Sequence, residues 1–292
     1  MKLLKRIARS LRSRTFYGYC DTLRRIKSRP VKLSEWQPVN ESLPRLVAIV
    51  YDRDVPLLIK SLQSLALHHS TLPPLTLFGD SDRALALLNE CLPASPRAVV
   101  ICHWEEALAT LQPAEQMFIR KWLASGKFGG YAKKFAITLA ASRRENILLS
   151  DADIIWFGPL LDANKGEAFF DSQIVIGLDY TRSYDSDVAS FLGESKIMTE
   201  PPINCGFVFY PQGIIDRVLN SRNYEALAAW AAHATCHFEQ TLIAYVFWKT
   251  GGRFFAVNEV ATSISDDFCY RNNIRAAVRH YAGCKHLFWR DI

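Results

Sequence analysis

Hydrophobic and polar residues alternate in blocks along this chain, and the blocks predict strands and helices in turn. Uninterrupted apolar runs predict buried strands at residues 45–51, 75–78 and 98–103. Between them, apolar residues recur every three or four positions, which predicts helices at residues 56–68 and 82–92. Strands that alternate with helices are typical of a parallel, doubly wound sheet, so we expect an α/β fold.

The alternation becomes less regular in the second half of the chain. A helical stretch that contains residues 131–141 leads into a strand at residues 146–150. The remaining predicted elements are short strands at residues 174–178, 205–210 and 254–257 and a helix at residues 238–248. No internal repeat, low-complexity segment or Gly/Ser linker interrupts the sequence. We therefore expect one continuous domain at residues 45–292 with a mixed sheet.

The composition is that of a globular protein. Of the 292 residues, 49% are hydrophobic, which is enough for a sizeable core. The apolar run at residues 241–248 falls far short of the roughly 20 residues that a membrane-spanning helix needs. Seven cysteines without any C-x-x-C pair suggest neither a disulfide framework nor a zinc site. A reducing, cytoplasmic location fits these features best.

The net charge of +6 is concentrated at the N-terminus. Residues 1–30 hold ten Lys/Arg and one acid, so the rest of the chain is slightly acidic, with 25 basic and 28 acidic residues. At 100° per residue, an apolar stripe (Leu3, Leu4, Ile7, Ala8 and Leu11) lies opposite a basic one (Lys2, Lys5, Arg6, Arg9 and Arg12). The segment lacks the apolar core of a signal peptide, so we do not expect cleavage. Residues 1–44 are thus predicted to form a basic, amphipathic arm.

Such an arm is typical of proteins that lie on an anionic membrane surface. We therefore expect residues 1–30 to bind the cytoplasmic face of a membrane peripherally. The alternative is a solvated helix packed on its own domain or a disordered start, since the apolar stripe is short and has no Trp or Phe before Phe16. Nucleic acid is not an expected partner, because the body offers no basic segment interleaved with aromatic residues.

The pattern Asp-x-Asp occurs four times, at residues 52/54, 80/82, 151/153 and 185/187. Only the context separates these pairs, and in open α/β sheets ligands bind beyond the carboxyl ends of strands. Asp80 suits the N-cap of a predicted helix and Asp82 its positively polarised first turn. The pair at 185/187 lies in a polar stretch and is most simply solvated.

Asp151 and Asp153 differ from the other pairs, because the apolar residues 147–149 and 154–156 flank them. Burying two carboxylates is costly unless something positive joins them. Side chains at positions i and i+2 of an extended chain point the same way, so both can bind one divalent cation that keeps open positions for phosphate oxygens. The alternative is a tight turn whose charges are neutralised by Lys133, Lys134 or Arg143.

The order of motifs around this pair resembles that of the GT-A fold nucleotide-sugar glycosyltransferases, especially glycosyltransferase family 8 and its relatives. The motifs are YAKK at 131–134, SDAD at 150–153, GLD at 177–179, NCGF at 204–207, EQ at 239–240 and HYAGCK at 280–285. The likeness covers about residues 46–291. It implies a GT-A fold, in which helices flank a Rossmann-like, mainly parallel sheet.

The resemblance also implies which residues bind the donor. These are, in chain order, Tyr51, Asp52, Lys133, Asp179, Asn204, Gly206 and Gly283. Tyr51 and Asp52 stand where relatives bind uracil, although Val55 replaces a nearby aromatic residue of those relatives. A uridine diphosphate (UDP) sugar is therefore the expected donor.

By the same resemblance, His280 is the third ligand of a divalent cation held by Asp151 and Asp153. Lys285 adds a fixed charge at the diphosphate, although one residue rather than the family's usual two separates it from Gly283. An imidazole beside two carboxylates favours Mn²⁺ over Mg²⁺. The alternative for His280 is an interior histidine satisfied by its neighbours.

The activity that the resemblance implies is transfer of a hexose from the donor to a glycan or lipid-linked acceptor, with retention of configuration. Glu239 and Gln240 would lie beneath the anomeric carbon and stabilise positive charge there, unless they only favour the dipole of a helix N-terminus. An inverting enzyme needs a carboxylate base, for which Asp266 and Asp267 are candidates.

Two other functions stay open at this point. Residues 47–55 also resemble the nucleophile strand of haloacid-dehalogenase-type phosphatases, in which Asp52 would attack phosphorus and Asp54 would act as acid. That family needs a later Gly-Asp motif, and Gly79-Asp80 comes too early. The other alternative is a non-catalytic adaptor at the membrane surface, against which the intact metal-binding set argues.

Overall fold

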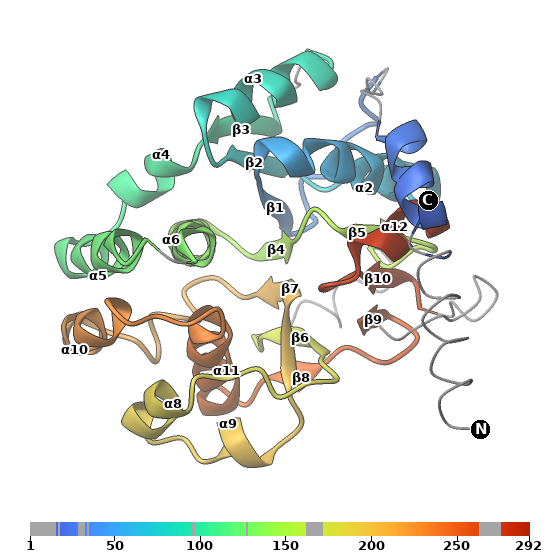
Figure 1. Ribbon diagram of the computed structural model, residues 1–292. Coiled ribbons are helices and arrows are strands. Elements are labelled where there is room, and N and C mark those ends of the chain that lie inside the picture. The colour runs from blue at the N-terminus through green and yellow to red at the C-terminus, as the bar shows by residue number, and fades with distance from the viewer. Residues whose placement is uncertain are drawn as a thin grey trace, which may run out of the picture.

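The computed structural model describes residues 16, 18–28, 33, 35–94, 97–126, 128–161, 172–262 and 276–292. In this part of the chain, one sheet of seven strands forms the centre of the molecule (Figure 1). Its strands are, in spatial order, β3 (Val99–His103), β2 (Leu75–Gly79), β1 (Arg45–Val50), β4 (Ile147–Ser150), β7 (Ile203–Tyr210), β6 (Val175–Leu178) and β8 (Arg253–Phe254). Strand β1 pairs in parallel with β2 and β4, whereas β7 runs antiparallel to β4 and β6. The predicted mixed, mainly parallel sheet is confirmed.

A second sheet brings the C-terminal part of the chain to the end of β4. It consists of β5 (Ile154–Trp156), β10 (Val278–His280) and β9 (Val260–Thr262), with β10 in the middle. Strand β10 runs antiparallel to β5, and its register pairs His280 with Ile154. The sequence pattern predicted none of these three as a strand, because each is only three residues long. The strand predicted at 254–257 also differs, since β8 is shorter and begins one residue earlier.

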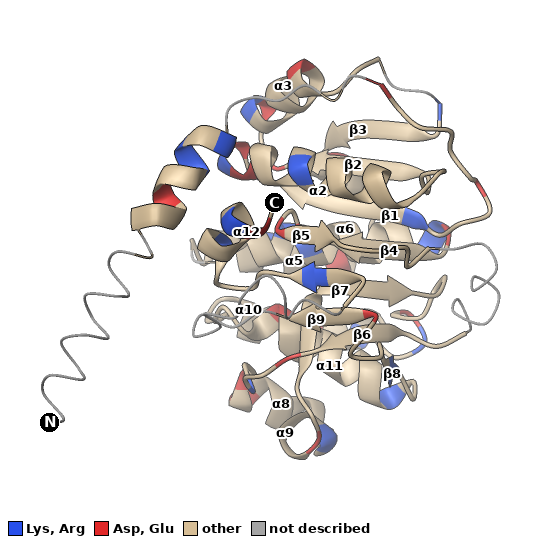
Figure 2. Ribbon diagram, turned by 90° about the vertical axis from the view of Figure 1, so that its right-hand side faces the viewer, with Lys and Arg blue, Asp and Glu red and all other residues tan. Residues whose placement is uncertain are grey.

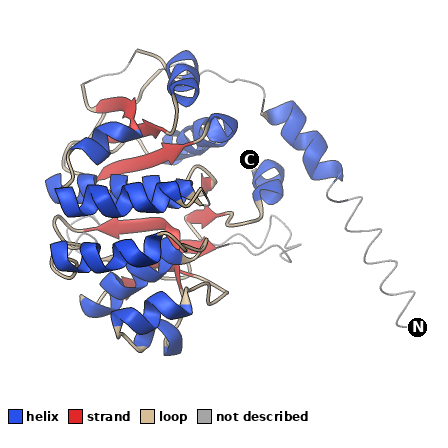
Figure 3. Cartoon of the chain, turned by 60° about the vertical axis from the view of Figure 1, so that its left-hand side comes forward, coloured by secondary structure: helices blue, strands red, loops and turns tan. Residues whose placement is uncertain are grey.

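Alternating strand residues divide the core into two layers. Val47 and Ile49 of β1 belong to one cluster, and Leu46, Ala48 and Val50 belong to the other, because successive side chains point to opposite faces of a sheet. Figure 3 shows helices lying over the strands. The first cluster includes α4 (Trp104–Ala109), α5 (Pro113–Ala124), α6 (Gly129–Arg144), α8 (Ser186–Leu192), α9 (Lys196–Thr199), α10 (Ser221–Ala231) and α11 (Phe238–Lys249). The second includes α2 (Val55–His68), α3 (Asp82–Cys91) and α12 (Lys285–Asp291).

The predicted helices are present, but the expectations for Asp80 and Asp185 are wrong. The N-cap of α3 is Ser81, whose hydroxyl accepts a hydrogen bond from the Ala84 backbone at 3.3 Å, so Asp80 does not cap this helix. Asp185 is not simply solvated, because its carboxylate caps α8 and accepts a hydrogen bond from the Val188 backbone at 3.1 Å. In both places a side chain satisfies a backbone N–H group that the first helical turn leaves without an intrahelical partner.

The later part of the predicted arm packs on the domain beside α12 (Figures 1 and 2). Cys20 is fully buried, and Phe16 and Leu23 pack against the second core cluster. Lys27 donates a hydrogen bond from Nζ to the carbonyl oxygen of Ile292 at 3.3 Å. Division of the chain at residue 45 stays a prediction, although residues of the arm contribute to the packing of the domain.

Several predictions fall on residues outside the described part of the chain. These are the two stripes at residues 1–15 and the candidate bases Asp266 and Asp267. None of the helices in the described part combines the length and the apolar character that crossing a membrane requires.

Candidate active site

Asp151, Asp153 and His280 meet beyond the carboxyl end of β4. One potential ligand atom from each side chain lies within 4.8 Å of the other two. The Nε2 atom of His280 lies 3.3 Å from Oδ1 of Asp153 and 3.6 Å from Oδ2 of Asp151. The pairing of β10 with β5 positions the imidazole, because it sets His280 directly beside the residue that follows Asp153. We refer to these three residues as the triad.

Asn204 orients the imidazole of His280. Its Oδ1 atom lies 2.6 Å from Nδ1 of His280 and also accepts a hydrogen bond from the Gly206 backbone at 3.0 Å. Because this oxygen is an acceptor, the hydrogen-bond network assigns the proton to Nδ1, which leaves Nε2 as the free ligand atom facing the carboxylates. Two carboxylates and one oriented imidazole are a donor set that fits Mn²⁺ or Mg²⁺.

Gly206 makes room for the imidazole. A Cβ atom at this position would overlap the ring of His280, so only glycine permits the observed approach. The sequence resemblance implied a sugar contact for Gly206, and the structure adds a steric reason for the glycine. The NCGF motif thus contributes both Asn204, which orients His280, and Gly206, which accommodates it.

Asp153 and His280 shift each other's pKa in the metal-free triad. Burial would raise the pKa of Asp153, but the hydrogen bond with His280 and the charges of His280 and Lys285 lower it below its usual range. Burial would lower the pKa of His280, but the hydrogen bond and charge of Asp153 raise it above its usual range. Each of the two groups thus favours the charged form of the other.

Lys134 is the cation that reaches the triad from α6. Its Nζ atom lies 2.8 Å from Oδ1 of Asp151 and 3.7 Å from Oε1 of Glu239, and it donates a hydrogen bond to the carbonyl of Cys205 at 3.0 Å. Burial would lower the pKa of Lys134, but the charges of Asp151 and Glu239 outweigh burial and raise it. Lys134 thus neutralises Asp151, as one of the alternatives for this pair required, yet the third ligand is also in place.

Lys133, which the resemblance implies to be a donor-binding residue, makes its contacts outside the triad. It donates a hydrogen bond to the carbonyl of Asp80 at 2.9 Å, and its Nζ lies 3.5 Å from the Asp80 carboxylate and 5.0 Å from the centre of the Trp104 ring. The structure therefore brings Lys134 to the triad rather than Lys133. Sequence reasoning left Lys133, Lys134 and Arg143 open as partners of the aspartate pair, because adjacent helical residues point about 100° apart and packing decides which of them faces inward.

The residues predicted to bind and stabilise the sugar form one network. Oδ2 of Asp179 accepts hydrogen bonds from Asn204 at 3.2 Å and from Gln240 at 3.4 Å. Gln240 also donates to the carbonyl of Ile203 at 2.6 Å. Burial and the charge of Asp151 raise the pKa of the neighbouring Glu239 to about 7, even though Lys134 opposes the shift. Side chains from β7, from α11 and from the residue that follows β6 thus meet beside the triad.

Lys285 lies at the other side of the triad, at the start of α12. Its Nζ atom is 4.0 Å from Oδ2 of Asp153 and 3.0 Å from Oδ2 of Asp54. Gly283, with a φ of 66°, takes the left-handed conformation that the turn between β10 and α12 requires. The shortened Gly283-to-Lys285 spacing therefore still brings the lysine to the triad.

The turn after β1 carries the predicted base-binding residues on the 3₁₀ helix η1 (Asp52–Asp54) and just before it. The Tyr51 hydroxyl lies against Gly130 of α6, where a Cβ atom would overlap it. Asp52 is partly exposed and lies 3.3 Å from Nε of Arg83. Asp52 and Asp54 point to different cations, an arrangement that does not favour the phosphatase alternative, in which both would face one phosphorus atom.

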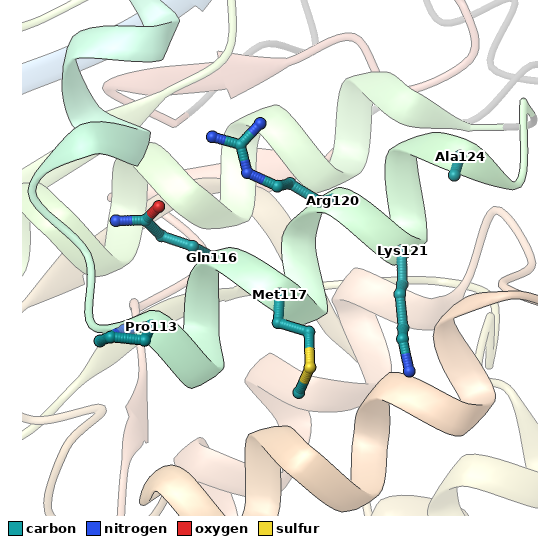
Figure 4. A pocket seen from close by; sticks show the side chains of 6 residues that line it. All are labelled: Pro113, Gln116, Met117, Arg120, Lys121 and Ala124. Carbon is teal, nitrogen blue, oxygen red and sulfur yellow. The ribbon is translucent and has the colours of Figure 1, made fainter.

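A shallow hollow on the outer side of α5 lies apart from these residues (Figure 4). Its lining residues all come from this helix: Pro113, Gln116, Met117, Arg120, Lys121 and Ala124. It contains none of the predicted site residues.

Comparison with solved structures identifies the fold. The crystal structure of mouse xyloside xylosyltransferase 1 in its apo form matches with a TM-score of 0.54 and 14% identity, over 82% of this chain and 97% of that one. Galactosyltransferase LgtC, in complex with donor and acceptor sugar analogues, matches with a TM-score of 0.44 and 12% identity, over 82% and 87% of the two chains. No protein-family model and no curated protein sequence matches the chain. The first similarity confirms the predicted GT-A fold.

Proposed function

We propose that this protein is a metal-dependent glycosyltransferase that moves a hexose from a nucleoside diphosphate sugar to a glycan or lipid-linked acceptor. The observation that carries the proposal is the triad, whose ligand atoms lie within 4.8 Å of one another at a strand end of a GT-A fold. The side chain of Asp151 is 29% exposed, compared with 8% for Asp153 and 6% for His280, so the cation would be reached from the Asp151 side. Mn²⁺ is the proposed ion, because the imidazole favours it over Mg²⁺.

Two kinds of positive charge would face the leaving diphosphate. A bound divalent cation would act as a Lewis acid toward the phosphate oxygens. Lys285 would hold a fixed ammonium beside it, where negative charge develops as the glycosidic bond breaks. Lys134 is not proposed to contact the diphosphate, because its ammonium is buried and pairs with Asp151 and Glu239.

The donor sugar would lie against the network of Asp179, Asn204 and Gln240. Asp179 has a carboxylate that can accept hydrogen bonds from sugar hydroxyls, while Asn204 and Gln240 hold that carboxylate in place. Gln240 and Glu239 would then stabilise positive charge at the anomeric carbon. The uracil of a UDP-sugar would lie near Tyr51 and Asp52 at the end of β1.

Binding of the donor is expected to raise the melting temperature in a metal-dependent way. A ligand that binds only the native state stabilises it by mass action, and at 100 times the Kd the melting temperature should rise by about 5 °C or more. The measurement is a thermal-shift panel of nucleotide sugars with Mn²⁺, in which each compound with a chelator is the control. Indifference to Mn²⁺ and to every UDP compound would contradict the proposal.

Transfer is expected to retain the anomeric configuration. None of the four carboxylates nearest the proposed metal and sugar sites is free to act as a base for an acceptor hydroxyl, since Asp151 and Asp153 belong to the triad, Asp179 is held by two amides and Glu239 pairs with Lys134. NMR of the first product formed, before any mutarotation, measures the configuration. An inverted product would make Asp266 and Asp267 the candidates for the base; the described part of the chain does not include them.

We also propose that the arm binds an anionic membrane surface from the cytoplasmic side, which would suit a lipid-linked acceptor. Cys20 and Leu23 belong to the packed part of the chain, so the deletion that tests the arm should end at residue 15. We expect the full chain, but not the deletion variant, to sediment with anionic vesicles at low salt, while both melt at the same temperature. Equal sedimentation of the two would rule out the arm as an anchor. Neutral vesicles are the control.

A further inference from the structure

Asp54 is placed where an aspartate normally caps a helix, yet it does not act as a cap. It is the N-cap residue of α2, and its side chain makes no capping hydrogen bond. Aspartate is among the preferred N-cap residues because its carboxylate can accept hydrogen bonds from the first free N–H groups of the helix. Asp54 has helical backbone angles, with a φ of −101° and a ψ of −3°, because it also ends η1, so it lacks the extended conformation of a capping residue. Its carboxylate contacts a residue elsewhere in the fold instead.

That contact is with Lys285, at the opposite end of the chain. Nζ of Lys285 donates a hydrogen bond to Oδ2 of Asp54 at 3.0 Å. The Asp54 side chain is 12% exposed, so the ion pair is partly shielded from water on the acidic side. Arg53 approaches the same oxygen at 3.8 Å, but its side chain is 80% exposed and it contributes little. Asp54 thus ties η1 and the start of α2 to the start of α12.

Lys285 lies between two carboxylates with different tasks. Asp153 is a candidate metal ligand and lies 4.0 Å from the ammonium, whereas Asp54 lies outside the triad. Once a divalent cation occupies the triad, the charge of Asp153 is neutralised and the cation repels the ammonium. Of these two carboxylates, only Asp54 would then still attract Lys285 and hold it beside the metal.

We propose that Asp54 is a positioning residue that keeps the Lys285 ammonium beside the occupied metal triad, ready for the donor diphosphate. This inference rests on the proposed function. Without Asp54, the lysine is expected to pair with Asp153 in the metal-free protein and to compete with the cation. In the loaded protein it is expected to move away from the diphosphate. The first effect weakens binding of the metal, and the second weakens binding of the nucleotide.

The test measures Mn²⁺ binding and UDP binding in the presence of Mn²⁺ by calorimetry. Asn has nearly the shape of Asp, and Asp54 makes no capping hydrogen bond that the substitution could remove, so Asp54→Asn is expected to fold. It should weaken UDP binding about tenfold, as expected for loss of a charge-assisted contact, while Asp54→Glu, which keeps the charge, should lose less. The control is Glu194→Gln, which breaks the Glu194–Lys249 ion pair of nearly equal exposure away from the site. It should leave UDP binding unchanged.

A double-variant cycle separates positioning from a general structural role. In the background of Lys285→Met, Asp54→Asn should cause no further loss of UDP affinity, because the residue through which Asp54 acts is gone. An equal loss with and without the lysine, or no loss in Asp54→Asn alone, overturns the inference and leaves the proposed function intact. Failure of the unaltered protein to bind both Mn²⁺ and UDP overturns the proposed function, and the inference falls with it.

Discussion

Asp153→Asn is expected to lower the rate of sugar transfer on the order of 10³-fold, because it removes a charged metal ligand and with it the charge stabilisation of the leaving diphosphate. The buried carboxylate contacts His280 at 3.3 Å and Lys285 at 4.0 Å, so the amide cannot replace its charge for either partner. Mn²⁺ affinity measured by calorimetry should fall at least about a hundredfold. The metal-free protein should stay folded at the temperature of the assay but melt at a lower temperature, since His280 loses the charged partner of a buried pair.

The matched control is Asp187→Asn, the same substitution in another Asp-x-Asp pair. Asp187 is exposed in the first turn of α8 and belongs to no predicted site. It should leave Mn²⁺ affinity and transfer unchanged. Full activity of Asp153→Asn, or equal effects of the two substitutions, would defeat the assignment of the metal to the triad.

Gly206→Ala is expected to abolish metal binding although it replaces none of the three ligands. The added methyl group would occupy the space of the His280 ring, so the imidazole must leave its place between Asn204 and the two aspartates. Overpacking of this kind costs about 1–3 kcal/mol, which should lower the melting temperature by several degrees. Calorimetry with Mn²⁺ and thermal unfolding of the metal-free protein measure the two effects.

Two further variants separate steric displacement from general damage. Gly177→Ala, in the neighbouring strand β6, adds a methyl group that meets its nearest atoms at an ordinary 3.6 Å or more, so it should bind Mn²⁺ normally. Gly206→Ala combined with His280→Ala should recover much of the lost thermal stability, because the overlapping ring is gone, but it should not recover metal binding. Normal Mn²⁺ binding by Gly206→Ala alone would show that His280 does not need its observed position.

Most of the central sheet could be predicted because each element carries its own periodic signal. The strands β1, β2, β3 and β4 are apolar runs, and α2, α3, α6 and α11 show helical spacing of apolar residues. Strands β5, β9 and β10 could not be read in this way, because a period of two has no room to appear in three residues. They exist through their pairing with one another, which depends on long-range contacts.

The candidate site was predictable to a similar, partial degree. Apolar flanks singled out Asp151 and Asp153 from three other pairs, and motif order pointed to His280, Asp179, Asn204 and Gln240. These side chains meet in the structure. The sequence could not show whether Lys133 or Lys134 contacts Asp151. The two residues are adjacent on α6, and this helix is buried on most of its sides, so the apolar spacing does not mark one inner face. Nor could the contact between Asp54 and Lys285 be predicted, since the two residues lie 231 positions apart in the sequence and only the fold brings them together.

By itself, the sequence determined which segments become strands and helices and where two carboxylates would have to be buried. It could do so because hydrophobic spacing and charge burial act over a few neighbouring residues. Only the tertiary structure decided which cation faces Asp151 and which cation Asp54 holds. Those outcomes depend on how helices rotate and strands pair when the whole core packs, and no short stretch of the chain contains that information.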